Sequence, residues 1–357
     1  MRKMKACVCF TVVCLGVLFW PRSSASETLR STPKHWSTIR TQEVQNDLRR
    51  RQSNCSAPTL SIAGHHDGLG SSIHVLSGAL AMAHNTGFVL DYGSWGSNWT
   101  RGSDCDTPGF ACLFMPLSSC PVRTTHDLVL DVNKPGVIGD IQKAVPTHYS
   151  RDASTSSDEF RQWWRAQGSM FIVNPTASTA SRVAAVRKML GIGSLPPGTA
   201  SMHVRRADKI TEADPTPLRF YFDSLHRSWV GRRVFLTTDG QEVADELDAL
   251  LFQSAAGWTV IRPTNSTFTP LGGTETFSYD LALRSLAMLS AHVEADVFIG
   301  TRSSNWCRLI DELRRREKFP ACCRPYLDVA PPKPKIPFWN FVERSRRKKR
   351  DEFFRMW

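Results

Sequence analysis

Outside its two ends, the sequence lacks a net positive charge. Residues 52–330 contain 26 Lys and Arg against 27 Asp and Glu, whereas the whole chain of 357 residues has a formal net charge of +12. The excess belongs to residues 1–51 and 331–357. A folded nucleic-acid-binding domain carries its basic residues on its own surface, because neutralising phosphates supplies much of its affinity. The near-neutral body therefore excludes nucleic acid as the expected partner.

The sequence also lacks a cluster of metal ligands at a recognised spacing. Cys105, Cys112 and Cys120 come close together, but no His lies among them at zinc-finger spacing. We therefore expect disulfides here and no metal ion. Seven cysteines follow the first twenty residues, so at least one is free or pairs with another chain, and the pairing itself stays open. These are Cys55, Cys105, Cys112, Cys120, Cys307, Cys322 and Cys323.

Long apolar runs are missing except for one at the amino terminus. Residues 6–20 are apolar, follow three basic residues and stop before Pro21. A run of about 15 residues lies between a signal-peptide core and a spanning helix. We expect an uncleaved membrane anchor over residues 1–20 with the rest of the chain in the lumen, and a cleaved signal peptide is the alternative. Three glycosylation triplets agree with a luminal chain, at Asn54, Asn98 and Asn265.

Composition and periodicity divide the rest of the chain. Residues 21–52 have few large apolar side chains, which indicates a stem or linker. Residues 53–195 are expected to form an amino-terminal α/β domain, and residues 196–330 a Rossmann-like domain after the break at Pro196-Pro197-Gly198. The Pro-rich, basic residues 331–357 are typical of an extended tail.

From residue 200 onward, expected strands and helices alternate. Strands are predicted in SMHVRR, RRVFLTTD, WTVIRP and DVFIGT, with a helix after each. This alternation indicates a parallel sheet covered by helices on both faces. The ligand of such a sheet binds outside the carboxyl ends of its strands. The fold class is therefore predicted as α/β with two domains.

Two adjacent arginines end the first of these strands. Arg205 and Arg206, followed by Asp208 and Lys209, bring cations to the edge where a parallel sheet presents ligands. Arginine donates bidentate hydrogen bonds to phosphate oxygens, so the cluster suits a diphosphate. An ordinary surface charge run is the alternative.

Small and hydroxyl residues mark two further candidates. Ser303 and Ser304 precede the last long helix, where backbone N–H groups and the helix dipole favour a phosphate, although either serine is equally suited to cap that helix. Gly68 and Gly70 allow a backbone to approach a ligand closely, but they lack the spacing of a dinucleotide fingerprint. Asp239 ends the strand after Thr238 and is also a candidate.

The residues 203–213, HVRRADKITEA, resemble the HVRR-T-D-K…T-E-A motif of the α1,6-fucosyltransferase family. That family includes bacterial enzymes that act on chitin oligosaccharides. Two other segments agree in order and spacing, the glycine turn with its helix at 68–90 and the A-D-F…T-x-S-S-x-x-C-R segment at 295–308. The Thr238-Asp239 pair fits the family's A-T-D turn. The HxRR motif alone would also admit α1,2- and protein O-fucosyltransferases.

The resemblance implies a GT-B-like fold and a metal-independent enzyme that inverts configuration. Its donor would be GDP-fucose, its acceptor a glycan or glycoprotein, and its location the Golgi membrane. By motif position, Arg205 would bind the β-phosphate, His203 and Asp208 would shape the nucleotide site, and Ser304 would contact phosphate. Glu212 would be the base that deprotonates the acceptor hydroxyl, with Lys209 beside it.

The sequence departs from the family pattern at two functional positions. Glu212 is one position early, so Asp214 is the nearest substitute for the base. Met288 occupies the position of the family's guanine-binding Asp, which leaves Asp280 as a candidate replacement or indicates a different nucleotide. The Asp104-Cys105-Asp106 triplet matches a metal-binding Asp-X-Asp formally, and we interpret it as a loop coincidence.

Overall fold

All residues that the computed structural model describes belong to one compact unit. The residues it describes are 38–64, 68–93, 95–121, 125–150, 157–206, 215–253, 257–264, 277–317 and 326–329. The predicted anchor and the basic tail lie outside them. None of the helices within these described ranges combines the length and the apolar character that crossing a membrane requires.

A three-stranded parallel sheet forms the first half of the fold. Its order is β2-β1-β3, with β1 at Thr59–Ala63, β2 at Val89–Leu90 and β3 at Leu128–Asp131. Four of the five β1 residues are buried, as expected of a parallel strand covered on both faces. β3 lies at the edge and keeps Leu128 and Val129 exposed.

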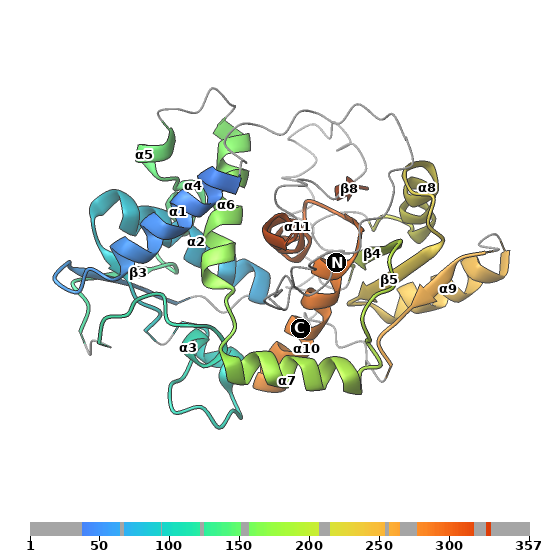
Figure 1. The fold of residues 1–357 in the computed structure, drawn as a ribbon, viewed down its shortest axis with the longest axis horizontal. Helices are drawn as coiled ribbons and strands as arrows, with labels where there is room; N and C mark the ends of the chain where they lie inside the picture. The colour runs from blue at the N-terminus through green and yellow to red at the C-terminus, as the bar shows by residue number, and fades with distance from the viewer. Residues whose placement is uncertain are drawn as a thin grey trace, which may run out of the picture. The chain divides into compact units, whose positions relative to one another are not determined.

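Helices surround this sheet and supply the largest side chains of its core. The strongest helix contacts join α2 to α6, and Trp163 and Trp164 of α6 are fully buried. The elements are α1 (Thr38–Gln52), α2 (Leu69–Thr86), η2 (Ser97–Thr100), α3 (Phe110–Leu113), α4 (Val137–Lys143), α5 (Thr147–Ser150), α6 (Ser157–Ile172) and α7 (Ala177–Met189) (Figure 1).

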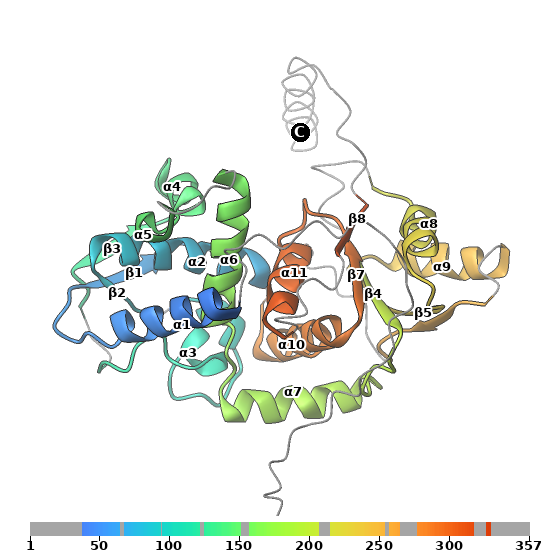
Figure 2. The same ribbon diagram turned by 45° about the horizontal axis from the view of Figure 1, so that its top comes forward.

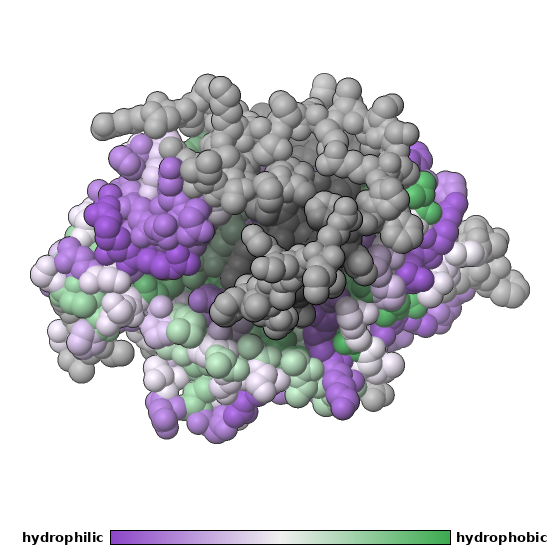
Figure 3. Space-filling view, viewed as in Figure 1, coloured by the Kyte–Doolittle hydropathy of each residue, from purple (hydrophilic) through white to green (hydrophobic). Residues whose placement is uncertain are grey.

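Helix α1 corrects the predicted linker. Residues 38–52, assigned above to a stem, are helical and belong to the fold, since Val44 and Leu48 are buried in the main core. Gln52 then clamps the edge strand β2, because its amide donates to the Leu90 carbonyl at 2.9 Å and accepts from the Leu90 N–H at 3.1 Å. Hydrophilic residues cover the outer side of α1 (Figure 3), which explains why its composition resembles a linker.

A five-stranded parallel sheet forms the second half, in the order β6-β5-β4-β7-β8. Its apolar side chains pack against α8 and α9 on one face and against α10 on the other. Figure 2 shows β4 and β7 between these two groups of helices. The elements are β4 (Thr199–Val204), α8 (Leu218–Ser228), β5 (Arg233–Thr238), α9 (Gln241–Gln253), β6 (Thr259–Ile261), α10 (Tyr279–Glu294), β7 (Val297–Gly300), α11 (Asn305–Glu317) and β8 (Tyr326–Asp328).

The two parallel sheets with their helices confirm the predicted α/β class. Every strand predicted after residue 199 is present, and the predicted boundary at residue 195 falls between α7 and β4. The halves share one core, because α11 packs against both α6 and α2. His74 of α2, Ser169 of α6 and Glu312 of α11 form a buried hydrogen-bonded group, with Glu312 Oε2 3.0 Å from His74 Nε2 and 2.7 Å from Ser169 Oγ.

The expectation of disulfides in the cysteine-rich loop is confirmed. Cys105 pairs with Cys112, and Cys120 pairs with Cys55 across a separation of 65 residues. Cys307 is buried and free, whereas Cys322 and Cys323 lie outside the described residues. The Asp-X-Asp match lies beside the shorter disulfide, where Asp104 forms an exposed ion pair with Arg182. Within the described ranges, no group of side chains is arranged to hold a metal ion.

Candidate active site

The carboxyl ends of β4 and β5 bring four polar side chains together. Strand register sets His203 beside Thr237, and the same register carries Arg205 to Asp239. His203 Nδ1 lies 2.8 Å from Thr237 Oγ1, and Arg205 Nη1 lies 2.9 Å from Asp239 Oδ2. Alternate residues of a strand share a face, so His203 and Arg205 both face the α10 side of the sheet. An imidazole and a guanidinium thus share the edge where ligands of parallel sheets bind.

Asp239 holds the turn after β4 in place. Its side chain is almost fully buried, and besides pairing with Arg205 it accepts the backbone N–H of Arg206 at 2.7 Å. A carboxylate so enclosed restricts the guanidinium it contacts. Because a guanidinium has five N–H donors, this ion pair is compatible with a second anion at Arg205. The geometry gives Asp239 a role in orienting Arg205, and its predicted contact with a nucleotide stays a prediction.

Arg206 lies on the opposite face from Arg205. Its guanidinium is buried against α9, where Nη2 lies 2.6 Å from Glu246 Oε2 and donates to the Thr216 carbonyl at 2.9 Å. The strand period of two separates these neighbours, so the two guanidinium groups lie on opposite faces of the sheet. Arg206 fixes the sheet against α9, and its predicted contact with a nucleotide stays a prediction.

The loop after β7 reaches the same edge, because β7 is the other neighbour of β4. Ser304 is buried at the start of α11, and its hydroxyl accepts the Cys307 N–H at 3.4 Å, the geometry of a helix cap. Ser303 is exposed in the preceding turn. The sequence left both helix capping and phosphate binding open for these serines, and the Ser304 contact is that of a helix cap. Its predicted contact with phosphate stays a prediction, as does that of Ser303.

The glycines before α2 occupy different surroundings. A Cβ at Gly70 would lie 3.1 Å from the backbone of Asn305 and Trp306, so this glycine permits α2 to approach the start of α11. Gly68 has open space around it and precedes the first residue of α2. At Gly70 the backbone therefore comes close to helix α11, and the close approach to a ligand predicted for this glycine stays a prediction. Within the described residues, a Cβ at either glycine would meet none of the four strand-end side chains among its nearest atoms.

His203 belongs to a buried chain of three polar side chains. Thr237 Oγ1 lies 2.8 Å from His203 Nδ1 and 2.7 Å from Nε2 of His292, a residue of α10. Burial, with a smaller contribution from the Arg205 charge, lowers the pKa of His203 to about 3. Burial also lowers the pKa of His292 well below its usual range, assisted by His203 and Arg314. Both imidazoles are therefore neutral at pH 7.

Cys307 lies directly beneath this edge. Its Sγ is 3.9 Å from the His203 carbonyl oxygen, and burial raises the pKa of the thiol to about 11. A Cβ at Gly300 would lie 2.8 Å from that sulfur, so β7 and α11 are in close contact here. A thiol so enclosed is a packing residue.

The predicted base and its neighbours fall outside the described residues. These are Asp208, Lys209, Glu212 and Asp214. The two positions considered for contact with guanine are both described and both belong to α10: Met288 is partly buried against the core, and Asp280 is exposed and paired with Arg284.

Sequence reasoning placed Thr237 at a strand end but gave it no role, and it missed His292. Thr237 precedes the recognised Thr238-Asp239 pair, and only the parallel register shows that it faces His203. His292 is one polar residue in an apolar helix, a pattern that also occurs in ordinary cores. The signal was available in part, because alternation along RVFLTTD, residues 233–239, places Thr237 and Asp239 on one face.

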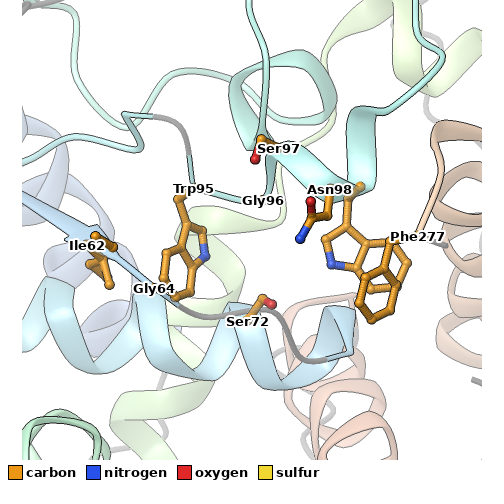
Figure 4. A pocket seen from close by; sticks show the side chains of 10 residues that line it. Ile62, Gly64, Ser72, Trp95, Gly96, Ser97, Asn98 and Phe277 are labelled. Carbon is orange, nitrogen blue, oxygen red and sulfur yellow. The ribbon is translucent and has the colours of Figure 1, made fainter. Parts of the chain in front are cut away.

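A small pocket lies at the carboxyl end of β1, bounded by Ile62, Gly64, Ser72, Trp95, Asn98, Trp99 and Phe277, among others. In Figure 4 the side chains of Trp95 and Asn98 border it from one side, and Ser72 borders it from α2. Trp95 and Trp99 are only 4% and 2% exposed, and Trp99 packs on Phe277 with ring centroids 4.5 Å apart. Because these aromatic faces are already covered, they offer no platform for stacking a sugar ring.

Neither the models of known protein families nor the curated proteins give a match to this sequence. Among solved structures, a NodZ α-1,6-fucosyltransferase soaked with GDP-fucose is 17% identical, with a TM-score of 0.39, over 71% of this chain and 92% of its own. FUT1 of Arabidopsis thaliana in complex with GDP is 12% identical, with a TM-score of 0.41, over 77% and 72%. POFUT1 in complex with GDP is 10% identical, with a TM-score of 0.43, over 78% and 100%. Similarity at this level assigns no activity to this chain.

Proposed function

We propose that this chain is an inverting fucosyltransferase that uses GDP-fucose and transfers fucose to a hydroxyl of a glycan. The proposal rests on the motif from His203 to Ala213 together with one geometric observation. His203 and Arg205 lie on one face at the carboxyl edge of β4, next to the strand that leads into α11. A motif resemblance alone would not say whether His203 and Arg205 face the same side of the sheet, as contact with one ligand requires.

In the proposed reaction, the acceptor hydroxyl attacks the anomeric carbon of fucose as the bond from that carbon to the β-phosphate oxygen breaks. The hydroxyl proton passes to a carboxylate, for which Glu212 is the motif-matched candidate. Negative charge accumulates on the departing GDP. Arg205, held by Asp239, would stabilise that charge, and donors fixed in advance are effective because they need no reorganisation during the reaction.

Binding of GDP and turnover of GDP-fucose test this proposal. The full-length chain is incubated with GDP-fucose, GDP-mannose and a panel of glycans without added metal, and products are analysed by mass spectrometry. We expect Arg205→Ala to lower kcat/KM at least a hundredfold, which is typical for the loss of one charge-stabilising donor. Arg205→Lys should recover only part of the activity, because lysine lacks the planar fork.

Arg182→Ala is the matched control, since it removes an arginine from an exposed ion pair that lies on α7. It should leave both GDP binding and turnover unchanged. Full activity of Arg205→Ala would contradict the proposed role of this residue. Transfer from GDP-mannose and not from GDP-fucose would overturn the donor.

The finer assignments belong to the same proposal. The motif favours α1,6 transfer to the core GlcNAc of N-glycans, and O-linked sugars or polysaccharides are the other acceptors to include in the panel. The apolar run before Pro21 supports a type II anchor in the Golgi membrane, with secretion as the alternative. Microscopy and the mass of the mature chain separate these two locations.

A second candidate function is a silent nucleotide- or glycan-binding protein. The observation that favours it is Met288, which stands where the family has its guanine-binding carboxylate. Such a protein would bind GDP in calorimetry and yet release no fucose from GDP-fucose. Product analysis of the wild-type chain therefore decides between the two functions.

A further inference from the structure

The contacts within the buried chain His203–Thr237–His292 limit which nitrogen of each histidine ring can be protonated. Thr237 Oγ1 contacts two ring nitrogens, Nδ1 of His203 and Nε2 of His292. A hydroxyl has a single proton, so it donates to one nitrogen and accepts from the other. Two arrangements satisfy this condition when both rings are neutral. In one, both histidines are protonated on Nε2, and in the other, both are protonated on Nδ1.

The two arrangements differ in where a buried N–H is left over. Within the described residues, His203 Nε2 and His292 Nδ1 are buried and have no hydrogen-bond partner. Protonation on Nδ1 would leave an N–H at His292, which is fully enclosed among the rings of Phe235 and Phe298. Protonation on Nε2 leaves the N–H at His203, at the strand edge beside Arg205. An unsatisfied buried donor is costly, and only the second position lies at the carboxyl edge of the sheet, where ligands of parallel sheets bind.

We infer that Thr237 and His292 are positioning residues that hold His203 as the Nε2–H tautomer, so that this N–H donates to an anionic oxygen of the donor's diphosphate. His292 Nε2–H donates to Thr237 Oγ1, and the Thr237 hydroxyl donates to His203 Nδ1. The inference rests on the proposed function for the identity of the anion. The tautomer itself follows from the contacts of the three side chains and from the enclosure of His292 by Phe235 and Phe298.

This arrangement explains why a second histidine lies in the apolar helix α10. Threonine by itself accepts or donates equally well, so it leaves the tautomer of His203 undetermined. His292 removes that freedom by supplying the donor to Thr237. Because the ring of His203 is also anchored at Nδ1, its Nε2–H direction is fixed before a ligand arrives, and preorganised donors bind anions without paying for reorientation.

Nitrogen NMR of the full-length chain labelled with ¹⁵N-histidine tests the tautomer without any ligand, with signals assigned from His203→Asn and His292→Asn. We expect both rings to be protonated on Nε2 and unprotonated on Nδ1. Protonation of either ring on Nδ1 would overturn the inference. This measurement does not depend on GDP binding, so a wild-type chain with the expected tautomers but no affinity for GDP would contradict the proposed function alone.

The positioning role is tested by calorimetry with GDP. Thr237→Val keeps the shape and removes the hydroxyl, and we expect it to weaken GDP binding about tenfold, the effect of one hydrogen bond to a charged group. Thr237→Ser restores the hydroxyl and should bind within about twofold of wild type by the same reasoning. Thr238→Val, on the opposite face of β5, is the matched control. If wild type binds GDP and Thr237→Val binds it equally well, positioning by Thr237 is wrong.

Discussion

The two parallel sheets of this protein are held by different means. In the three-stranded sheet, β2 has only two residues, and its place is secured by the Gln52 side chain and by the disulfide from Cys55 to Cys120. In the five-stranded sheet, β4 and β5 pair over six residues, and no disulfide is found among its described residues. Short strands need clamps from outside the sheet, whereas a long register positions side chains by itself. The polar edge with His203 and Arg205 occurs on the sheet whose register is long.

Among the variants that test this comparison, removal of the Cys55–Cys120 disulfide should lower the free energy of unfolding most. Closing a loop of 65 residues restricts the unfolded chain strongly, and Cys55→Ser with Cys120→Ser should lower the free energy of unfolding by about 4 kcal/mol. The Cys105–Cys112 bridge closes only 7 residues, and its removal should cost about 2 kcal/mol. Urea denaturation of both double variants measures the difference. Equal losses would mean that loop closure does not secure the first sheet.

A smaller effect is expected from Gly78→Ala, at the contact of α2 with α4. A Cβ there would lie 2.1 Å from the backbone oxygen of Ile141, so the helices must separate. We expect a loss of about 1–3 kcal/mol, the usual cost of overpacking. Gly139→Ala in α4 is the control, because a Cβ there meets open space and should stabilise by about 0.5 kcal/mol. Thermal unfolding of the two variants measures both, and a neutral Gly78→Ala would contradict this tight contact.

Lowering the pH should reduce the free energy of unfolding, because the second half of the fold contains buried neutral histidines. The unfolded chain protonates His203 near pH 6.5, whereas folded His203, whose pKa burial and Arg205 lower to about 3, stays neutral. The unfolded state therefore binds more protons in this range, and the free energy of unfolding falls as the pH drops below 6.5. At pH 5 His203 alone should cost about 2 kcal/mol, and His292 acts in the same direction.

Urea denaturation at pH 7 and pH 5 measures this loss. His292→Phe removes one of the two buried imidazoles, so its stability should differ less between the two pH values than that of the wild type. A wild-type protein equally stable at both pH values would show that these rings are not kept neutral by burial.

The sequence predicted the second sheet well, because its strands and helices carry apolar residues at clear periods and are bounded by Gly and Pro. It predicted the first part less well. Helix α1 has only Val44 and Leu48 as large buried apolar side chains in its described portion, so its composition resembled a linker. Cysteine pairing depends on distances that no spacing gives. The opposite directions of Arg205 and Arg206 follow from strand alternation, but the choice of face depends on which helices cover it.

Because Cys307 contacts the His203 carbonyl, alkylation of its thiol can report local opening of the structure at this strand edge. A thiol with a raised pKa and no exposed surface reacts with alkylating reagents only when β7 and α11 part. The rate at which Cys307 is labelled therefore measures how often β7 and α11 separate. Because the sulfur lies beneath His203, a ligand bound above that edge would slow the labelling without touching the cysteine.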